Sequence, residues 1–102
     1  MVVDSISDGL VDGAVSGLMG LAFQDLAETA AVPFWQALIN NKQFSSAEMA
    51  FQLTRSESED DVPGGTFTLG GTNSSLFTGN IEFLPLVDSS TPTFWQLSVS
   101  GS

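Results

Sequence analysis

The sequence predicts a mainly β fold with one or two short helices, and three observations support this. Short apolar stretches alternate with polar residues and are bounded by Gly, Pro, Asn and Ser. Helical spacing of apolar residues begins at one place, after Pro33. The chain has 102 residues with no Cys and no His, so we expect one small domain without disulfides or a structural zinc.

The first third of the chain is expected to contain turns, one strand and a loop. Residues 4–14 carry two Asp-Gly turn signals. The apolar run 15–23 predicts a buried strand, although its glycines weaken that interpretation. Residues 25–31 read as a loop.

A helix is expected to begin at Pro33, because proline suits the first helical position. Phe34 and Leu38 then fall on one face, and Asn40-Asn41 provides a C-cap.

Strands are expected over four later stretches, residues 50–54, 66–69, 79–86 and 93–99. Asn73-Ser74-Ser75 forms a turn between two of them. We expect Phe34, Trp35 and Trp95 to pack in a core rather than stack on a ligand, with a hydrogen-bond partner for the Trp95 N–H.

The charge balance is strongly acidic, with twelve Asp and Glu against two Lys and Arg and a net charge of −10. This charge argues against nucleic acid and anionic membrane as partners, and it suits a protein that works in acid. No segment approaches the ~20 apolar residues of a membrane span.

The acidic run 57–61 could bind calcium, but it lacks the EF-hand spacing and glycine, so a solvated loop is favoured.

Five segments together resemble the pepsin-like aspartic proteases, most closely those of mushroom-forming, basidiomycete fungi. They are VSGLMGLAF, VPFWQALINN, EMAFQLTR, GGTFTLGGTNSSLFTGNIEFLPL and FWQLSVSG. The resemblance covers residues 6–101 and implies a partial pepsin-like acid protease fold, with 1–102 as a single partial peptidase domain. Residues 6–53 correspond to the end of the N-terminal lobe and the inter-lobe strands, and residues 65–101 to the start of the C-terminal lobe.

The resemblance also implies a role for Gly17, Leu18, Met19 and Gly20. They match the apolar-apolar-Gly segment that passes through a ψ-shaped loop crossing and supports the catalytic centre. The position of Leu18 lines the primary side-chain pocket in the family. We expect glycine here because only a residue without Cβ allows two backbones to pass so closely.

The residues that would perform catalysis are missing. The family uses two aspartates, each in Asp-Thr-Gly or Asp-Ser-Gly, which share one proton across a bound water. Neither tripeptide occurs in this sequence, and there is no tyrosine for the flap. We therefore predict no catalytic residue, no metal and no cofactor here, and we reject Asp12 and Asp25 as a catalytic pair.

The leading hypothesis is a fragment of an acid endopeptidase that cannot cleave its polypeptide substrate alone. A second is a non-catalytic interaction or inhibitory fragment that pairs with itself, through unpaired strand edges, or with an intact protease. A third is an unrelated small acidic β domain that binds a ligand.

The parent is expected to be extracellular or vacuolar. The N-terminus has no basic signal-peptide region, so either the chain stays inside or its true start lies upstream. Asn73 begins a possible N-glycosylation sequon.

Overall fold

The computed structural model describes residues 4–57 and 62–101, so residues 58–61 of the expected acidic loop lie outside the described part. The chain is mainly extended, with one short α-helix and one small antiparallel sheet, as predicted. Two units can be distinguished, one made of Met1–Ala37 and Leu84–Ser102 and the other of Leu38–Phe83. They are described separately.

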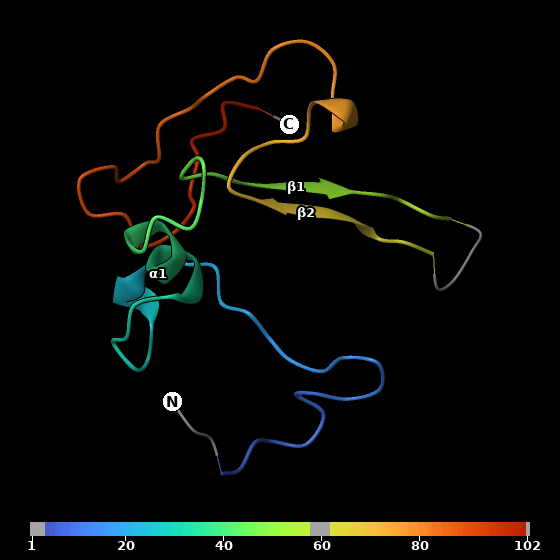
Figure 1. Cartoon of the computed structure of the whole chain (residues 1–102), viewed down its shortest axis with the longest axis vertical. Helices are drawn as coiled ribbons and strands as arrows, with labels where there is room; N and C mark the ends of the chain where they lie inside the picture. The colour runs from blue at the N-terminus through green and yellow to red at the C-terminus, as the bar shows by residue number, and fades with distance from the viewer. Residues whose placement is uncertain (1–3, 58–61, 102) are drawn as a thin grey trace. The chain divides into compact units, whose positions relative to one another are not determined.

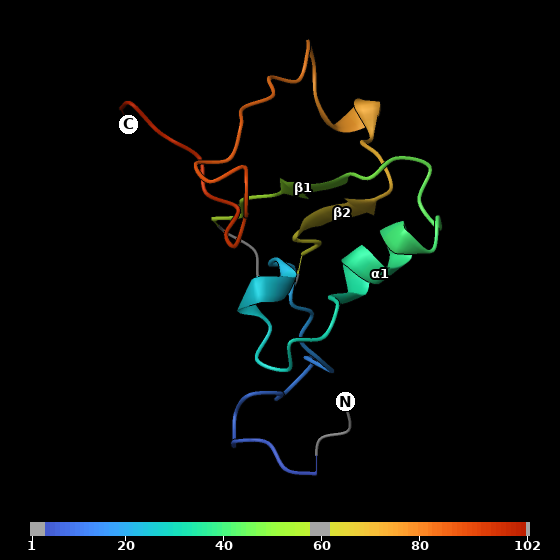
Figure 2. The same cartoon turned by 90° about the vertical axis from the view of Figure 1, so that its left-hand side faces the viewer.

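The second unit contains a two-stranded antiparallel hairpin of β1 (Met49–Leu53) and β2 (Gly65–Leu69). Its register pairs Met49 with Leu69 at one end and Leu53 with Gly65 at the other. The strands lie side by side in both views (Figures 1 and 2). The strand expectations for residues 50–54 and 66–69 are thus confirmed to within one residue.

A cross-strand aromatic pair stabilises the middle of this hairpin. Phe51 lies opposite Phe67, and their rings stack with centroids 4.5 Å apart and planes 13° apart. Such pairs are the main side-chain contribution to a two-stranded sheet. Both rings remain exposed, however, so the pair is not part of a closed core.

Hydrogen bonds extend the hairpin beyond both ends of its ladder. Near the loop, the Thr54 N–H donates to the Gly64 carbonyl at 2.9 Å and the Thr54 hydroxyl donates to the Pro63 carbonyl at 2.7 Å. At the other end, the Gly70 N–H donates to the Glu48 carbonyl at 2.8 Å. These contacts define where the two strands enter and leave the ladder.

The helix α1 (Phe34–Asn40) begins directly after Pro33, as predicted. Trp35 is buried, but Phe34 is 52% exposed and Trp95 53% exposed, so the expectation that all three pack in a core is right for Trp35 alone. Successive helical residues point about 100° apart, and in the described part of the chain Trp35 is the α1 residue whose ring contacts other aromatic rings.

The end of α1 is a Schellman motif. The Gln43 N–H donates to the Leu38 carbonyl and the Lys42 N–H to the Ile39 carbonyl, both at 2.9 Å. Lys42 adopts φ +56°, the left-handed conformation that this motif requires. The predicted cap is therefore placed correctly, although a lysine rather than an asparagine takes the strained position.

Three expected strands, residues 15–23, 79–86 and 93–99, do not form within the described residues. They are largely extended, but a strand exists only where a neighbouring strand receives its hydrogen bonds. One hydrogen bond, from the N–H of Val87, the residue directly after 79–86, to the Gln96 carbonyl at 2.9 Å, reaches the region 93–99. A 3-10 turn, η1 (Gln24–Leu26), overlaps the expected loop 25–31.

The core of the described residues is very small. Trp35, 5% exposed, is the one buried large apolar side chain among them, while Leu53, Phe83 and Val99 are each more than three-quarters exposed. A chain of this length should bury more than half of its surface.

No helix in the described part is both long and apolar enough to cross a membrane.

Candidate functional site

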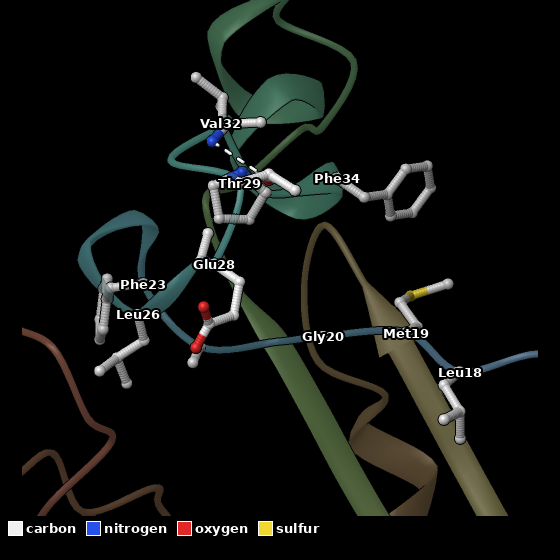
Figure 3. A pocket seen from close by; sticks show the side chains of 13 residues that line it. Leu18, Met19, Gly20, Phe23, Leu26, Glu28, Thr29, Val32 and Phe34 are labelled. Atoms are coloured by element: carbon white, nitrogen blue, oxygen red, sulfur yellow. Dashed lines mark hydrogen bonds between the residues drawn. The ribbon is translucent and has the colours of Figure 1, made fainter. Parts of the chain in front are cut away.

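The segment Leu18-Met19-Gly20 borders an apolar hollow in the first unit. Its backbone is extended, and the side chains of Leu18 and Met19 are 70% and 55% exposed. The hollow has a volume of about 620 Å³. Figure 3 shows Leu18 and Met19 at one end of it and Phe23 and Leu26 at the other.

The remaining wall of the hollow comes from the segment that leads into α1. It includes Val32 and Phe34, with Glu28 as the charged residue. The hydroxyl of Thr29 is engaged in a hydrogen bond within the same loop, since its oxygen accepts from the Ala31 N–H at 3.4 Å. The lining suits an apolar side chain, and it presents no nucleophile paired with a base.

Two indole N–H groups fix the backbone directly after Gly20. Trp95 Nε1 donates to the Leu21 carbonyl at 2.7 Å, and Trp35 Nε1 donates to the Ala22 carbonyl at 3.0 Å. Along the sequence, Trp95 lies 74 residues from its acceptor and Trp35 lies 13 residues from its acceptor. Successive carbonyls of one extended segment are therefore tied to two distant parts of the chain.

The same indoles pack with Phe23, the next residue. The Phe23 ring meets Trp35 edge-on with centroids 5.6 Å apart, and it lies 4.5 Å from Trp95. The two indole centroids are 5.9 Å apart. We call Phe23, Trp35 and Trp95 the aromatic cluster. The cluster holds residues 21–23, which directly follow the Leu18–Gly20 segment in the chain. It therefore positions that segment.

The sequence did not indicate this arrangement in full. It predicted that the Trp95 N–H needs a partner, and the structure confirms that it has one. It did not indicate that Trp35 and Trp95 bind adjacent carbonyls. The sequence signal that could have indicated it is the presence of two tryptophans in a chain that has no Tyr and no His. Their indole N–H groups are thus the only aromatic hydrogen-bond donors in the sequence.

The crowding expected around the glycines is not supplied by the described residues. A Cβ built on Gly17 or Gly20 meets no atom within 4 Å. A second backbone segment that crosses at this place would have to come from outside these residues. The described residues thus supply no close backbone approach at Gly17 or Gly20, and the expected crossing stays a prediction for the longer parent protein.

Two aspartates of the described residues, Asp12 and Asp88, make only local hydrogen bonds. Asp12 accepts from the Gly13 N–H at 2.7 Å, and Asp88 accepts from the Ser90 hydroxyl at 3.0 Å. Both are contacts of turn residues. In the described ranges no three metal-ligating side chains gather at one place. The arrangement therefore offers an apolar wall and a positioned backbone rather than acid–base chemistry.

The chain belongs to the eukaryotic aspartyl protease family, whose model matches residues 2–102. Among similar proteins is the Major aspartyl peptidase 1 of Cryptococcus neoformans var. grubii, 36% identical over 105 residues that cover 98% of this chain and 21% of that protein. Gastricsin of Oryctolagus cuniculus is 34% identical over 83 residues, covering 81% of this chain and 20% of that protein. The vacuolar aspartic protease of Candida albicans is 32% identical over 89 residues, which cover 87% of this chain and 20% of that protein.

The chain thus spans about a fifth of the length of these curated relatives. The identity extends over nearly all of it, including the segments quoted for the pepsin-like resemblance. Family membership is accordingly a property of the whole chain and not of one short motif.

Proposed function

We propose that this chain is a supporting segment of an acid endopeptidase and that it does not catalyse alone. The parent cleaves polypeptides with a water activated between two aspartates, both outside these 102 residues. The observation that carries this proposal is a family match over residues 2–102 in a sequence that contains neither Asp-Thr-Gly nor Asp-Ser-Gly.

Within the parent, Leu18 forms part of the wall of the primary substrate pocket, and Gly17, Leu18, Met19 and Gly20 support the catalytic loop. The exposed Leu18 side chain beside an apolar hollow is consistent with a surface that meets substrate. The aromatic cluster supports the same role, because it ties down the two residues that follow Gly20.

The large exposed apolar surface supports the view that other parts of the parent cover this segment. Leu53, Phe83 and Val99 are almost free of contacts that exclude water. Large apolar side chains left exposed in this way mark surface on which further protein packs. The division into end of one lobe, residues 6–53, and start of the next, residues 65–101, is part of the same proposal.

The parent is proposed to act outside the cell or in the vacuole. One of the relatives is a vacuolar aspartic protease. The net charge of −10 is compatible with such an acidic compartment, because protonation of carboxyl groups lowers the self-repulsion of the chain.

A chimera tests the proposal. The matching fifth of the Cryptococcus peptidase is replaced by this chain, and acid proteolysis of an unfolded protein is measured with and without pepstatin. We expect pepstatin-sensitive cleavage by the chimera and none by the 102-residue chain. A folded, secreted chimera that lacks activity would contradict the supporting role.

The alternative is an interaction fragment, and one observation favours it. In the described part of the chain, β1 and β2 pair with each other and with no third strand, so each has an open edge. Open edges and exposed apolar faces promote pairing between chains. Sedimentation shows whether the chain forms a defined dimer, and mixing it with a pepsin-like protease shows whether it inhibits. A monomer without effect on that protease excludes this alternative.

A further inference from the structure

The turn after β2 carries a feature that protease function does not require. Asn73-Ser74-Ser75 is the one Asn-X-Ser/Thr sequence in the printed chain. It lies at the start of the 3-10 turn η2 (Ser74–Leu76), the short orange turn that follows β2 in Figure 1. We propose that Asn73 is an N-glycosylation site that is used when the chain enters the secretory route. The natural occurrence of this modification rests on the proposed extracellular or vacuolar location.

The geometry of the turn places the required groups together. The Ser75 hydroxyl donates to Asn73 Oδ1 at 2.7 Å, and the Ser75 N–H donates to the same oxygen at 3.1 Å. Both side-chain hydrogen bonds that the described residues give Asn73 use Oδ1. The amide nitrogen Nδ2, which is the atom that receives the sugar, is thus not engaged within them.

The position also leaves room for a glycan on the folded unit. Asn73, Ser74 and Ser75 are all exposed. Asn73 lines a hollow of about 160 Å³ next to the hairpin, together with Phe77. A bulky, hydrated sugar is compatible with an exposed turn, whereas it could not be accommodated at a buried residue.

The reaction is a group transfer catalysed by an oligosaccharyltransferase. Asn73 Nδ2 forms a bond to the anomeric carbon of an oligosaccharide carried on a lipid diphosphate. The bond from that carbon to the diphosphate breaks, the lipid diphosphate leaves, and the amide loses one proton. The Ser75 hydroxyl supplies the second recognised group of the motif.

The competing interpretation is that Asn73 is only the cap of η2, because Asn is a favoured cap residue. The substitution Asn73→Asp separates the two roles. Aspartate keeps an oxygen that accepts from the Ser75 N–H, and so it keeps the cap, but it has no amide nitrogen to receive a sugar. Ser74→Ala is a matched control that leaves both Asn73 and Ser75 in place.

The test uses the whole 102-residue chain behind a cleavable secretion leader in a yeast host. Cells and medium are both analysed by mass spectrometry before and after peptide N-glycosidase in heavy-oxygen water. We expect a glycan on most leader-cleaved molecules of the natural sequence and of Ser74→Ala. We expect none on Asn73→Asp or on Ser75→Ala.

Leader cleavage reports entry into the secretory route, and cellular material is included, so poor secretion does not obscure the result. Leader-cleaved chain with an unmodified Asn73 would overturn the inference. That outcome would leave the proposed protease function untouched, because the assay does not depend on catalysis. Conversely, an inactive chimera would not affect the glycosylation result.

Discussion

Trp35 and Trp95 share one role at the backbone but differ in their surroundings. Each donates its indole N–H to the carbonyl of one of the two residues after Gly20, yet Trp35 is 5% exposed and Trp95 is 53% exposed. In the 102-residue chain, we predict that Trp95→Phe, which leaves Trp35, emits at a shorter wavelength and is quenched less by acrylamide than Trp35→Phe. Equal quenching of the two variants would show that the aromatic cluster does not form.

Leu18 gives a prediction for substrate preference. Leu18→Ala in the chimera removes apolar area from the proposed pocket wall. We expect kcat/KM to fall at least roughly tenfold for peptides with a large apolar side chain at the cleavage site and to change little for small ones, since one methylene group in a hydrophobic pocket is worth about 1–3 kcal/mol. A uniform loss across both peptide sets would assign Leu18 a structural role instead.

At the scale of elements, Gly65 controls the loop end of the hairpin. Its φ of +145° is unfavourable for other residues, and a Cβ there would overlap the Gln52 carbonyl oxygen. We predict that Gly65→Ala speeds hydrogen exchange of the β1 and β2 amides by at least severalfold. Gly64→Ala is the matched control, because a Cβ at Gly64 meets nothing within 4 Å. Similar exchange rates in both variants would contradict this.

The end of α1 offers a stabilising substitution. Lys42 holds a left-handed conformation that costs a non-glycine residue about 1 kcal/mol. We expect Lys42→Gly to slow hydrogen exchange of the Gln43 amide, which closes the Schellman motif. Lys42→Ala is the comparison that removes the same charge without relieving the conformation. Equal slowing in both would mean that charge, not backbone geometry, controls the helix end.

Local elements were the part of the fold that could be predicted from sequence. Pro33, the alternation around Phe51 and Phe67, and the Asn73 turn depend on neighbouring residues, and each lies where it was expected. The expected strand 15–23 failed because a strand needs a partner, and its pattern does not say whether one is present. The Trp95 contact with Leu21 spans 74 residues, a distance over which no local pattern operates.

At the scale of the whole molecule, exposed apolar surface and high net charge oppose each other. The charge of −10 keeps chains apart at neutral pH. As pH falls toward the isoelectric point of the sequence, about 4.1, that repulsion fades. We predict that light scattering of the isolated chain rises steeply on acidification. The chimera, in which the apolar faces are covered, should stay clear under the same conditions. A chain that remains monomeric at pH 4 would contradict this prediction.

The central claim is that the catalytic aspartates lie outside these residues and that the chain positions rather than performs the chemistry. The most direct measurement is acid proteolysis of an unfolded protein by the purified 102-residue chain, with and without pepstatin. We predict no cleavage above a buffer control at any chain concentration. Cleavage that rises with chain concentration and is blocked by pepstatin would contradict the account.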